Sequence, residues 1–170
     1  MIRPIVKYGK EDVLHQPSQR VDQITPDLRH LVEDMVETMY AAPGIGLAAP
    51  QVGVALRIFV IDLSLGRDSS GLIALVNPEF VERQGMQLEE EGCLSVPGFN
   101  ATVARPDLAV VRGLDLEGQE RTVEGKGLLA RAFQHEMDHL DGKVFVDRLR
   151  GIKRELIVRK IHKLNRTGKW

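Results

Sequence analysis

The stretch Gln134-His135-Glu136-Met137-Asp138-His139 carries the pattern H-E-x-x-H, in which two histidines stand four positions apart. On an α-helix, residues i and i+4 lie on the same face, so both imidazoles can bind one metal ion. Glu136 then lies beside the metal without binding it, as in catalytic sites of this pattern. The motif therefore predicts a helix that carries a metal site.

The residues around this motif are mostly apolar, which indicates a helix buried on most of its faces. A surface helix with two solvated histidines is the alternative. A buried histidine pair with a buried glutamate needs compensation for lost hydration, and a metal ion supplies it. We therefore favour a metal site over a histidine pair satisfied within the core. The flanking apolar residues are Leu128, Leu129, Ala130, Ala132, Phe133 and Leu140.

Composition favours one compact domain. The chain has 170 residues, of which 43% are hydrophobic, so residues 1–170 are expected to form a single catalytic domain with a core of its own. No apolar run approaches a membrane span, and the N-terminus is too interrupted for a signal peptide. Cys93 is the only cysteine, which excludes a disulfide within the chain and favours a reducing, cytoplasmic location.

Charge is unevenly distributed along the chain. The net charge of −1 argues against a DNA-binding protein by bulk charge. However, residues 148–170 hold nine of the 23 basic residues and only one of the 24 acidic residues. This basic segment is either an ordinary solvated helix or a surface that contacts RNA.

Helix signals appear in two further segments. Thr25-Pro26-Asp27 predicts a helix start, with Thr25 as the N-cap, and Pro43-Gly44 predicts the end of that helix. Apolar residues at helical spacing predict a last helix from Leu149 to about Leu164, with Ile152, Leu156, Ile157, Ile161 and Leu164 as its apolar side. Residues 167–170 are expected to be disordered.

Strands are predicted between these helices, mostly in hairpins. Asn77-Pro78 is expected to stop one strand before the next begins. Strands arranged in hairpins favour an α+β fold, with antiparallel sheets packed around the buried motif helix and a C-terminal helix at the end. The predicted strands are Leu56–Asp62, Leu72–Val76, Phe80–Met86, Thr102–Arg105, Leu108–Leu116 and Gln119–Val123.

A catalytic metal site needs about three protein ligands, and the motif helix offers only two. Cys93, within Glu90-Glu91-Gly92-Cys93-Leu94-Ser95, is the best third candidate, because a metal holds a thiolate deprotonated. Gly92 lets the backbone bend towards the metal. The glycine-rich segment Gly44–Gly53 is either a tight connection or a loop whose backbone approaches a ligand, with Gln51 as its only side-chain donor.

Three segments together resemble the three motifs of the peptide deformylases, in the helix-ending form common in bacteria. They are Gly44-Ile45-Gly46-Leu47-Ala48-Ala49-Pro50-Gln51, Glu91-Gly92-Cys93-Leu94-Ser95 and Gln134–His139. The resemblance implies a metal-dependent hydrolase of protein biosynthesis, which removes formate from N-formylmethionine in N-terminal methionine processing. It also implies that nascent N-formylmethionyl peptides are the partners.

The resemblance assigns residue roles as well. Cys93, His135 and His139 would bind one divalent metal, Glu136 would be the general acid/base, and Gln51 with the backbone N–H of Leu94 would form the oxyanion hole. The family uses Fe(II) and accepts zinc, nickel or cobalt. Two imidazoles and a thiolate bind zinc at least as tightly, so the sequence leaves the metal open.

Substrate binding is also implied by the resemblance. The peptide would lie extended against the backbone around Ile45, Gly46 and Gly92, by β-augmentation. A methionine pocket would be lined by Ile45, Leu128, the stem of Arg131, Ala132 and His135. Leu128 and Ala132 share one helix face with both histidines, although plain core packing is the alternative for them. Because family members act on emerging chains, the basic C-terminal helix is also a candidate for ribosomal RNA contact.

Glu91 and Arg105 are expected to pair and to orient the cysteine segment or the motif helix. The alternative for Glu89-Glu90-Glu91 is a solvated acidic run.

Two rival functions remain at this stage. A zinc endopeptidase shares H-E-x-x-H but usually takes a third histidine or glutamate downstream, and none stands in a matching pattern. A non-catalytic, metal-stabilised RNA-binding module would need a fourth protein ligand, and the chain offers no convincing one.

Overall fold

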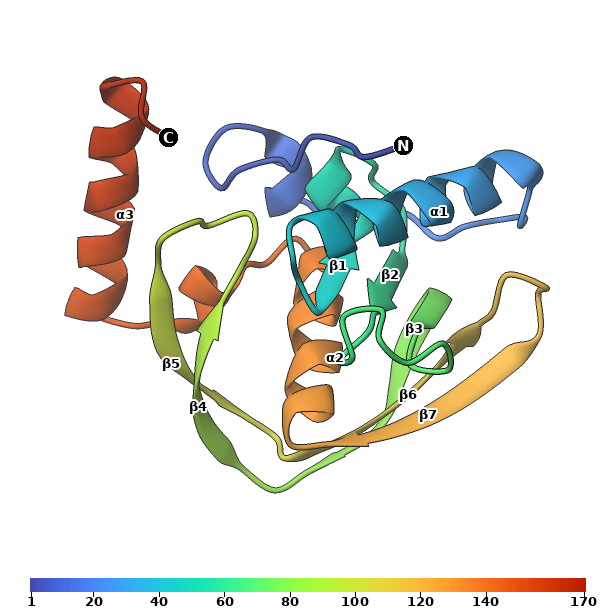
Figure 1. The fold of residues 1–170 in the computed structure, drawn as a ribbon. Helices are drawn as coiled ribbons and strands as arrows, with labels where there is room; N and C mark the ends of the chain where they lie inside the picture. Colours follow the sequence, from blue (N-terminus) through green and yellow to red (C-terminus); the bar gives the residue numbers. More distant parts are fainter.

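The computed structural model describes all of residues 1–170 (Figure 1). It contains three α-helices, three short 3-10 helices and seven strands. The helices are α1 (Pro26–Ala41), α2 (Leu128–Leu140) and α3 (Ile152–Arg166), and the 3-10 helices are η1 (Asp12–His15), η2 (Ala49–Val52) and η3 (Phe145–Arg148). The strands are β1 (Gly46–Ala48), β2 (Ile58–Ile61), β3 (Ile73–Gln84), β4 (Gln87–Gly92), β5 (Asn100–Arg105), β6 (Leu108–Leu114) and β7 (Glu120–Lys126).

The strands form two antiparallel sheets, and the motif helix α2 packs between them (Figure 1). The larger sheet has the order β1-β2-β3-β6-β7, and the smaller one pairs β4 with β5. Phe133 and Leu140 of α2 are fully buried in a core shared with Phe59 and Ile61 of β2. The α+β prediction, with antiparallel sheets around a buried central helix and a helix at the end, is confirmed.

Helix α1 begins where its sequence predicts. Thr25 has an extended backbone and its hydroxyl accepts a hydrogen bond from the N–H of Leu28 at 3.2 Å, while Pro26 occupies the first turn. Met35 and Met39 are fully buried against β1 and β2 and fill the core. This packing holds the glycine-rich segment after α1 against the rest of the molecule.

The prediction that Asn77-Pro78 ends a strand is wrong. Strand β3 runs through both residues, and its register against β6 shifts between Val76 and Glu79. Asn77 adopts a left-handed backbone (φ 51°), and its side-chain amide bonds both main-chain polar groups of Val21. A β-bulge therefore absorbs the two residues that would interrupt a regular strand.

Two strands were not predicted. Strand β1 lies inside the segment Gly44–Gly53, where three glycines and a proline argue against regular structure, yet Leu47 pairs with Val60 of β2. Strand β4 covers the acidic run, pairs with β5 and ends at Gly92, one residue before Cys93. These two strands bring two of the three sequence motifs towards α2.

The C-terminal segment differs from its prediction in two respects. On α3, only Ile161 is fully buried, whereas Ile152 and Leu156 are exposed, so the predicted apolar side is only partly covered. Residues 167–170 were expected to be disordered, but Trp170 is buried in the core cluster that holds Ile161 and Phe145. Across the chain, no helix has both the length and the apolar character needed to cross a lipid bilayer.

Candidate metal centre

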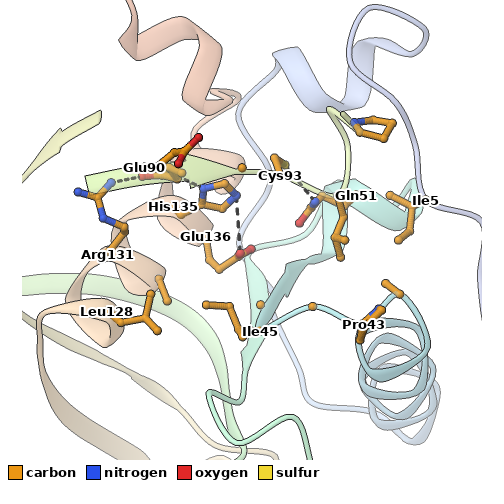
Figure 2. A pocket seen from close by; sticks show the side chains of 18 of the residues that line it. Ile5, Pro43, Ile45, Gln51, Glu90, Cys93, Leu128, Arg131, His135 and Glu136 are labelled. Atoms are coloured by element: carbon orange, nitrogen blue, oxygen red, sulfur yellow. Dashed lines mark hydrogen bonds and ion pairs between the residues drawn. The ribbon is translucent and has the colours of Figure 1, made fainter. Parts of the chain in front are cut away.

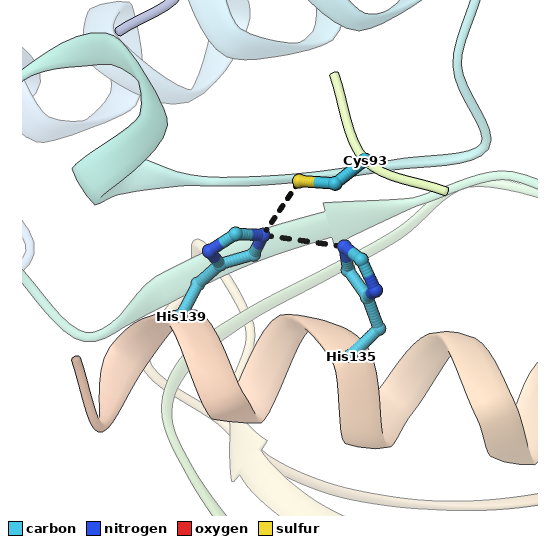
Figure 3. Close-up of side chains that lie close together, drawn as sticks. All are labelled: Cys93, His135 and His139. Atoms are coloured by element: carbon cyan, nitrogen blue, oxygen red, sulfur yellow. Dashed lines mark hydrogen bonds between the residues drawn. The ribbon is translucent and has the colours of Figure 1, made fainter. Parts of the chain in front are cut away.

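Helix α2 and the end of strand β4 bring Cys93, His135 and His139 together (Figure 3). Sγ of Cys93 lies 3.3 Å from Nε2 of His139, and Nε2 of His139 lies 3.2 Å from Nε2 of His135. The three candidate ligand atoms all lie within 4.8 Å of one another. The sulfur predicted from a segment 42 positions upstream therefore meets both imidazoles.

The chemistry of these three side chains fits a cation. Burial disfavours a charge on His135, but hydrogen bonds with Cys93 and Glu91 outweigh that effect and hold the pKa of His135 well above its usual value. Burial and the neighbouring His135 hold the pKa of His139 well below its usual value. Without a metal, an imidazolium at His135 is thus favoured between the thiol and Glu91, and a bound metal ion would bring positive charge to the same place.

Glu91 is the centre of a buried ion network behind His135. Its carboxylate accepts a hydrogen bond from Nδ1 of His135 at 2.5 Å, two from Arg105 at 2.6 and 3.0 Å, and one from Arg131 at 2.5 Å. Burial raises its pKa, but these partners outweigh burial and hold the pKa of Glu91 far below its usual range. The predicted pairing of Glu91 with Arg105 is confirmed, and Glu91 is no member of a solvated acidic run.

Asp138, next to His139, extends this network away from the metal cluster. It accepts hydrogen bonds from Nη1 of Arg105 at 2.8 Å and from two nitrogens of Arg148 at 2.6 and 3.1 Å. The contacts of Arg148 with Asp138 and of Arg131 with Glu91 were not predicted from the sequence. Asp138 itself was the sequence signal for such an ion network, because a carboxylate on a buried helix face requires a cationic partner.

Glu136 lies beside the cluster, and its exposed fraction is 3%. Burial raises the pKa of Glu136 to about 7, and its Oε2 has no hydrogen-bond partner. The other oxygen, Oε1, packs against the backbone of β1, because a Cβ added to Gly46 would lie 2.7 Å from it. Gly46 is therefore required for the close approach of Glu136, rather than for a turn.

The two predicted oxyanion donors lie on the same side of the cluster. Gln51 is almost completely buried, with its amide oxygen held by the N–H of Ala48 at 3.0 Å. Its Nε2 donates to Oγ of Ser95 at 3.2 Å and approaches Sγ of Cys93 at 3.6 Å. The main-chain N–H of Leu94 donates to no other group. Ser95, which holds the amide in place, was not predicted.

A cavity of about 700 Å³ opens in front of these side chains (Figure 2). It is lined by every residue that the resemblance assigns to substrate binding, namely Ile45, Gly46, Gly92, Leu128, Arg131, Ala132 and His135. Leu128 is 54% exposed at its edge, whereas Ala132 is buried in the core as well as lining the cavity. The guanidinium of Arg131 donates a hydrogen bond to Glu91, so the aliphatic stem of Arg131 is the part available to line the cavity.

Comparisons with known proteins agree with this geometry. The family profile described as Polypeptide deformylase matches residues 2–155. The chain belongs to the peptide deformylase family. A peptide deformylase from Acidobacterium capsulatum is 50% identical over 170 residues, covering 100% of this chain and 99% of that protein.

Solved structures of peptide deformylases share the whole fold. A deformylase from Legionella pneumophila matches with a TM-score of 0.91 and 43% identity, covering 99% of this chain and 98% of that one. A deformylase from Ehrlichia chaffeensis, solved in complex with actinonin, matches with a TM-score of 0.86 and 38% identity over 95% of this chain and 96% of that one.

The peptide deformylase assignment decides between the functions that the sequence left open. The chain is a metal-dependent hydrolase that removes the formyl group from nascent peptides. Its cysteine and two histidines form a metal site typical of deformylases. The endopeptidase and the RNA-binding module are therefore set aside.

Proposed function

We propose that Cys93, His135 and His139 hold one divalent metal ion, and that Glu136, Gln51 and Leu94 carry out deformylation beside it. The observation that supports this assignment most is the convergence of three ligand atoms next to a buried carboxylate with an unpartnered oxygen. Residues 1–170 act in this proposal as one catalytic domain, in the cytoplasm, where a single unpaired cysteine stays reduced.

A metal ion held by Cys93, His135 and His139 would supply Lewis-acid polarisation of the formyl carbonyl and would lower the pKa of a water molecule to roughly 7. Glu136 takes a proton from the attacking water on Oε2, the oxygen that has no partner within the protein. Gln51 Nε2 and the N–H of Leu94 donate to the oxygen that gains negative charge as the water adds to the formyl carbon. Glu136 then delivers its proton to the leaving amine, which departs poorly without it.

The cavity positions the substrate in this proposal. The methionine side chain lies against Leu128, Ala132 and the stem of Arg131, on the same helix face as His135. The peptide backbone extends along Ile45, Gly46 and Gly92, beside β1 and β4, which are edge strands of their sheets and can pair with an added strand. The formyl group then lies between Glu136 and Cys93.

Iron(II) is the proposed resident metal, from the family resemblance, with zinc, nickel and cobalt as substitutes. One experiment tests both the metal and the residue roles. Wild-type protein reconstituted anaerobically with Fe(II) should release formate from formyl-Met-Ala-Ser, whereas Glu136→Ala should retain metal and lose about 10²–10⁴-fold in kcat. A fully active Glu136→Ala variant would refute the role of Glu136, and activity restored only by zinc would refute the role of iron.

We also propose that the basic face of α3 contacts ribosomal RNA near the emerging peptide. Arg159, Lys163 and Arg166 are exposed together at the C-terminal end of α3. Changing all three to glutamate should abolish co-sedimentation with ribosomes at low salt and leave formate release from a free peptide unchanged. Truncation is a poorer test, because Ile161 and Trp170 are buried. Unchanged co-sedimentation of the triple variant would refute this contact.

A further inference from the structure

Trp170 joins two segments of the chain, the N-terminal residues around Tyr8 and the turn that holds Phe99, to the end of α3. The indole Nε1 of Trp170 donates to the main-chain oxygen of Tyr8 at 2.7 Å. Nζ of Lys10 donates to the main-chain oxygen of Trp170, also at 2.7 Å. The indole ring meets that of Phe99 edge to face, with centroids 6.0 Å apart. We call Trp170 with Tyr8, Lys10 and Phe99 the C-terminal clasp.

The chain after α3 turns back so that Trp170 can make these contacts. Gly168 has a left-handed backbone (φ 71°), and the N–H of Trp170 donates to the carbonyl of Leu164 at 3.1 Å. In Figure 1 the C-terminus points from the end of α3 towards the N-terminal segment. The exposed fraction of Trp170 is only 6%, so the indole ring is a core element rather than a loose end.

Two of the clasped segments form one side of the active-site cavity. The N–H of Tyr8 donates to the carbonyl of Ser95, and the N–H of Val6 donates to the carbonyl of Gln51, each at 2.8 Å. The N–H of Phe99 donates to the carbonyl of Val96, which closes the turn after Cys93. Pro97 and Gly98 lie within this turn and Ile5 directly precedes Val6, and all three line the cavity.

This side of the cavity lies away from the proposed methionine pocket. Figure 2 shows Ile5 and Pro43 on the opposite side of Cys93 and Glu136 from Leu128 and Arg131. With the methionine against Leu128 and the formyl group at Glu136, the wall of Ile5, Pro97 and Gly98 remains for the rest of the substrate.

We infer that Trp170 is a positioning residue, which fixes this distal wall and thereby sets the affinity for substrate residues that follow the methionine. It acts through Phe99 and Tyr8 and makes no hydrogen bond with the metal ligands or with Glu136. The inference rests on the proposed placement of the substrate. A rigid wall lowers the entropy cost of binding a substrate. Loss of this rigidity should therefore raise KM for substrates that extend beyond the methionine and leave kcat nearly unchanged.

The test compares Trp170→Ala, Trp170→Phe and the exposed control Lys153→Ala, which should behave like the wild type, on formyl-Met-Ala-Ser and on formyl-methionine. Trp170→Ala should raise KM for the tripeptide about fivefold, keep kcat within about twofold, and leave KM for formyl-methionine unchanged. Trp170→Phe, which keeps an aromatic ring against Phe99, should restore most of the affinity. Wild-type activity on the tripeptide tests the proposed function separately.

An unchanged KM in folded Trp170→Ala would overturn the inference, as would equal losses with both substrates or a loss of bound metal. If Trp170→Ala does not fold, Phe99→Leu is judged by the same comparison of KM and kcat. Trp170 is the only tryptophan, so its emission reports the clasp directly. Emission in Phe99→Leu should shift to longer wavelength, and an unshifted spectrum counts against coupling through Phe99.

Discussion

Glu91 holds His135 by a hydrogen bond of 2.5 Å from the imidazole Nδ1 to the carboxylate Oε1. This bond leaves Nε2 of His135 directed at His139 and Cys93, as a metal ligand requires. Two arginines in turn hold Glu91, so its negative charge persists although it is buried. The orientation of His135 on α2 thus depends on an ion network that includes Glu91 and Arg105 of the smaller sheet, β4–β5.

Replacing Glu91 with glutamine should weaken metal binding by about 10- to 100-fold, because the amide neither fixes the imidazole nor balances the arginines. Titration of the metal against a chelator measures this loss. Glu89→Gln, an exposed change two residues away on β4, is the matched control and should bind metal like the wild type. Equal affinities for both variants would contradict the role of Glu91.

Arg105→Ala should destabilise the fold by about 3–5 kcal/mol, because it leaves the carboxylates of Glu91 and Asp138 buried with fewer partners. Urea unfolding of the metal-free protein measures the change. Arg112→Ala removes an exposed pair with Glu79, which water and salt screen, and should destabilise the fold far less than Arg105→Ala. If the two variants are equally stable, the buried network contributes nothing beyond surface pairing.

Gly46→Ala should lower kcat by about 10²-fold, the lower end of what general acid–base catalysis contributes. The new methyl group would lie 2.7 Å from Oε1 of Glu136 and displace the carboxylate from its place beside the cluster. Metal content should stay the same, because Gly46 meets none of the three ligands. Formate release and metal analysis on the same sample provide the test. Full activity would show that the position of Glu136 tolerates this displacement.

The Tyr40 hydroxyl, which donates to Asp62 at 2.6 Å, should make stability depend on alkaline pH. Burial, followed by the bond to Asp62, raises the pKa of Tyr40 to about 12. A folded pKa above the unfolded value of about 10 gives stability that is present below pH 10 and is lost as the pH rises through 12. The stability difference between wild type and Tyr40→Phe should therefore shrink from pH 9 to pH 12. A constant difference would contradict the assignment.

Most elements of the fold were predictable because their signals are local. Thr25 caps α1, Gly127 precedes α2, and the apolar residues around His135 mark a buried helix. The continuity of β3 was not predictable, because the bulge at Asn77 depends on bonds to Val21, 56 positions away. The buried ion pairs of Arg131 and the burial of Trp170 likewise arise from contacts between distant segments.

In the proposed site, one sulfur and two imidazole nitrogens hold a single metal ion with a position left open. X-ray absorption at the metal edge of the zinc-loaded protein measures this most directly. We predict one sulfur at about 2.3 Å, two nitrogens at about 2.0–2.1 Å and one further light atom that exchanges with solvent. A spectrum without sulfur, or with four protein ligands, would contradict the account.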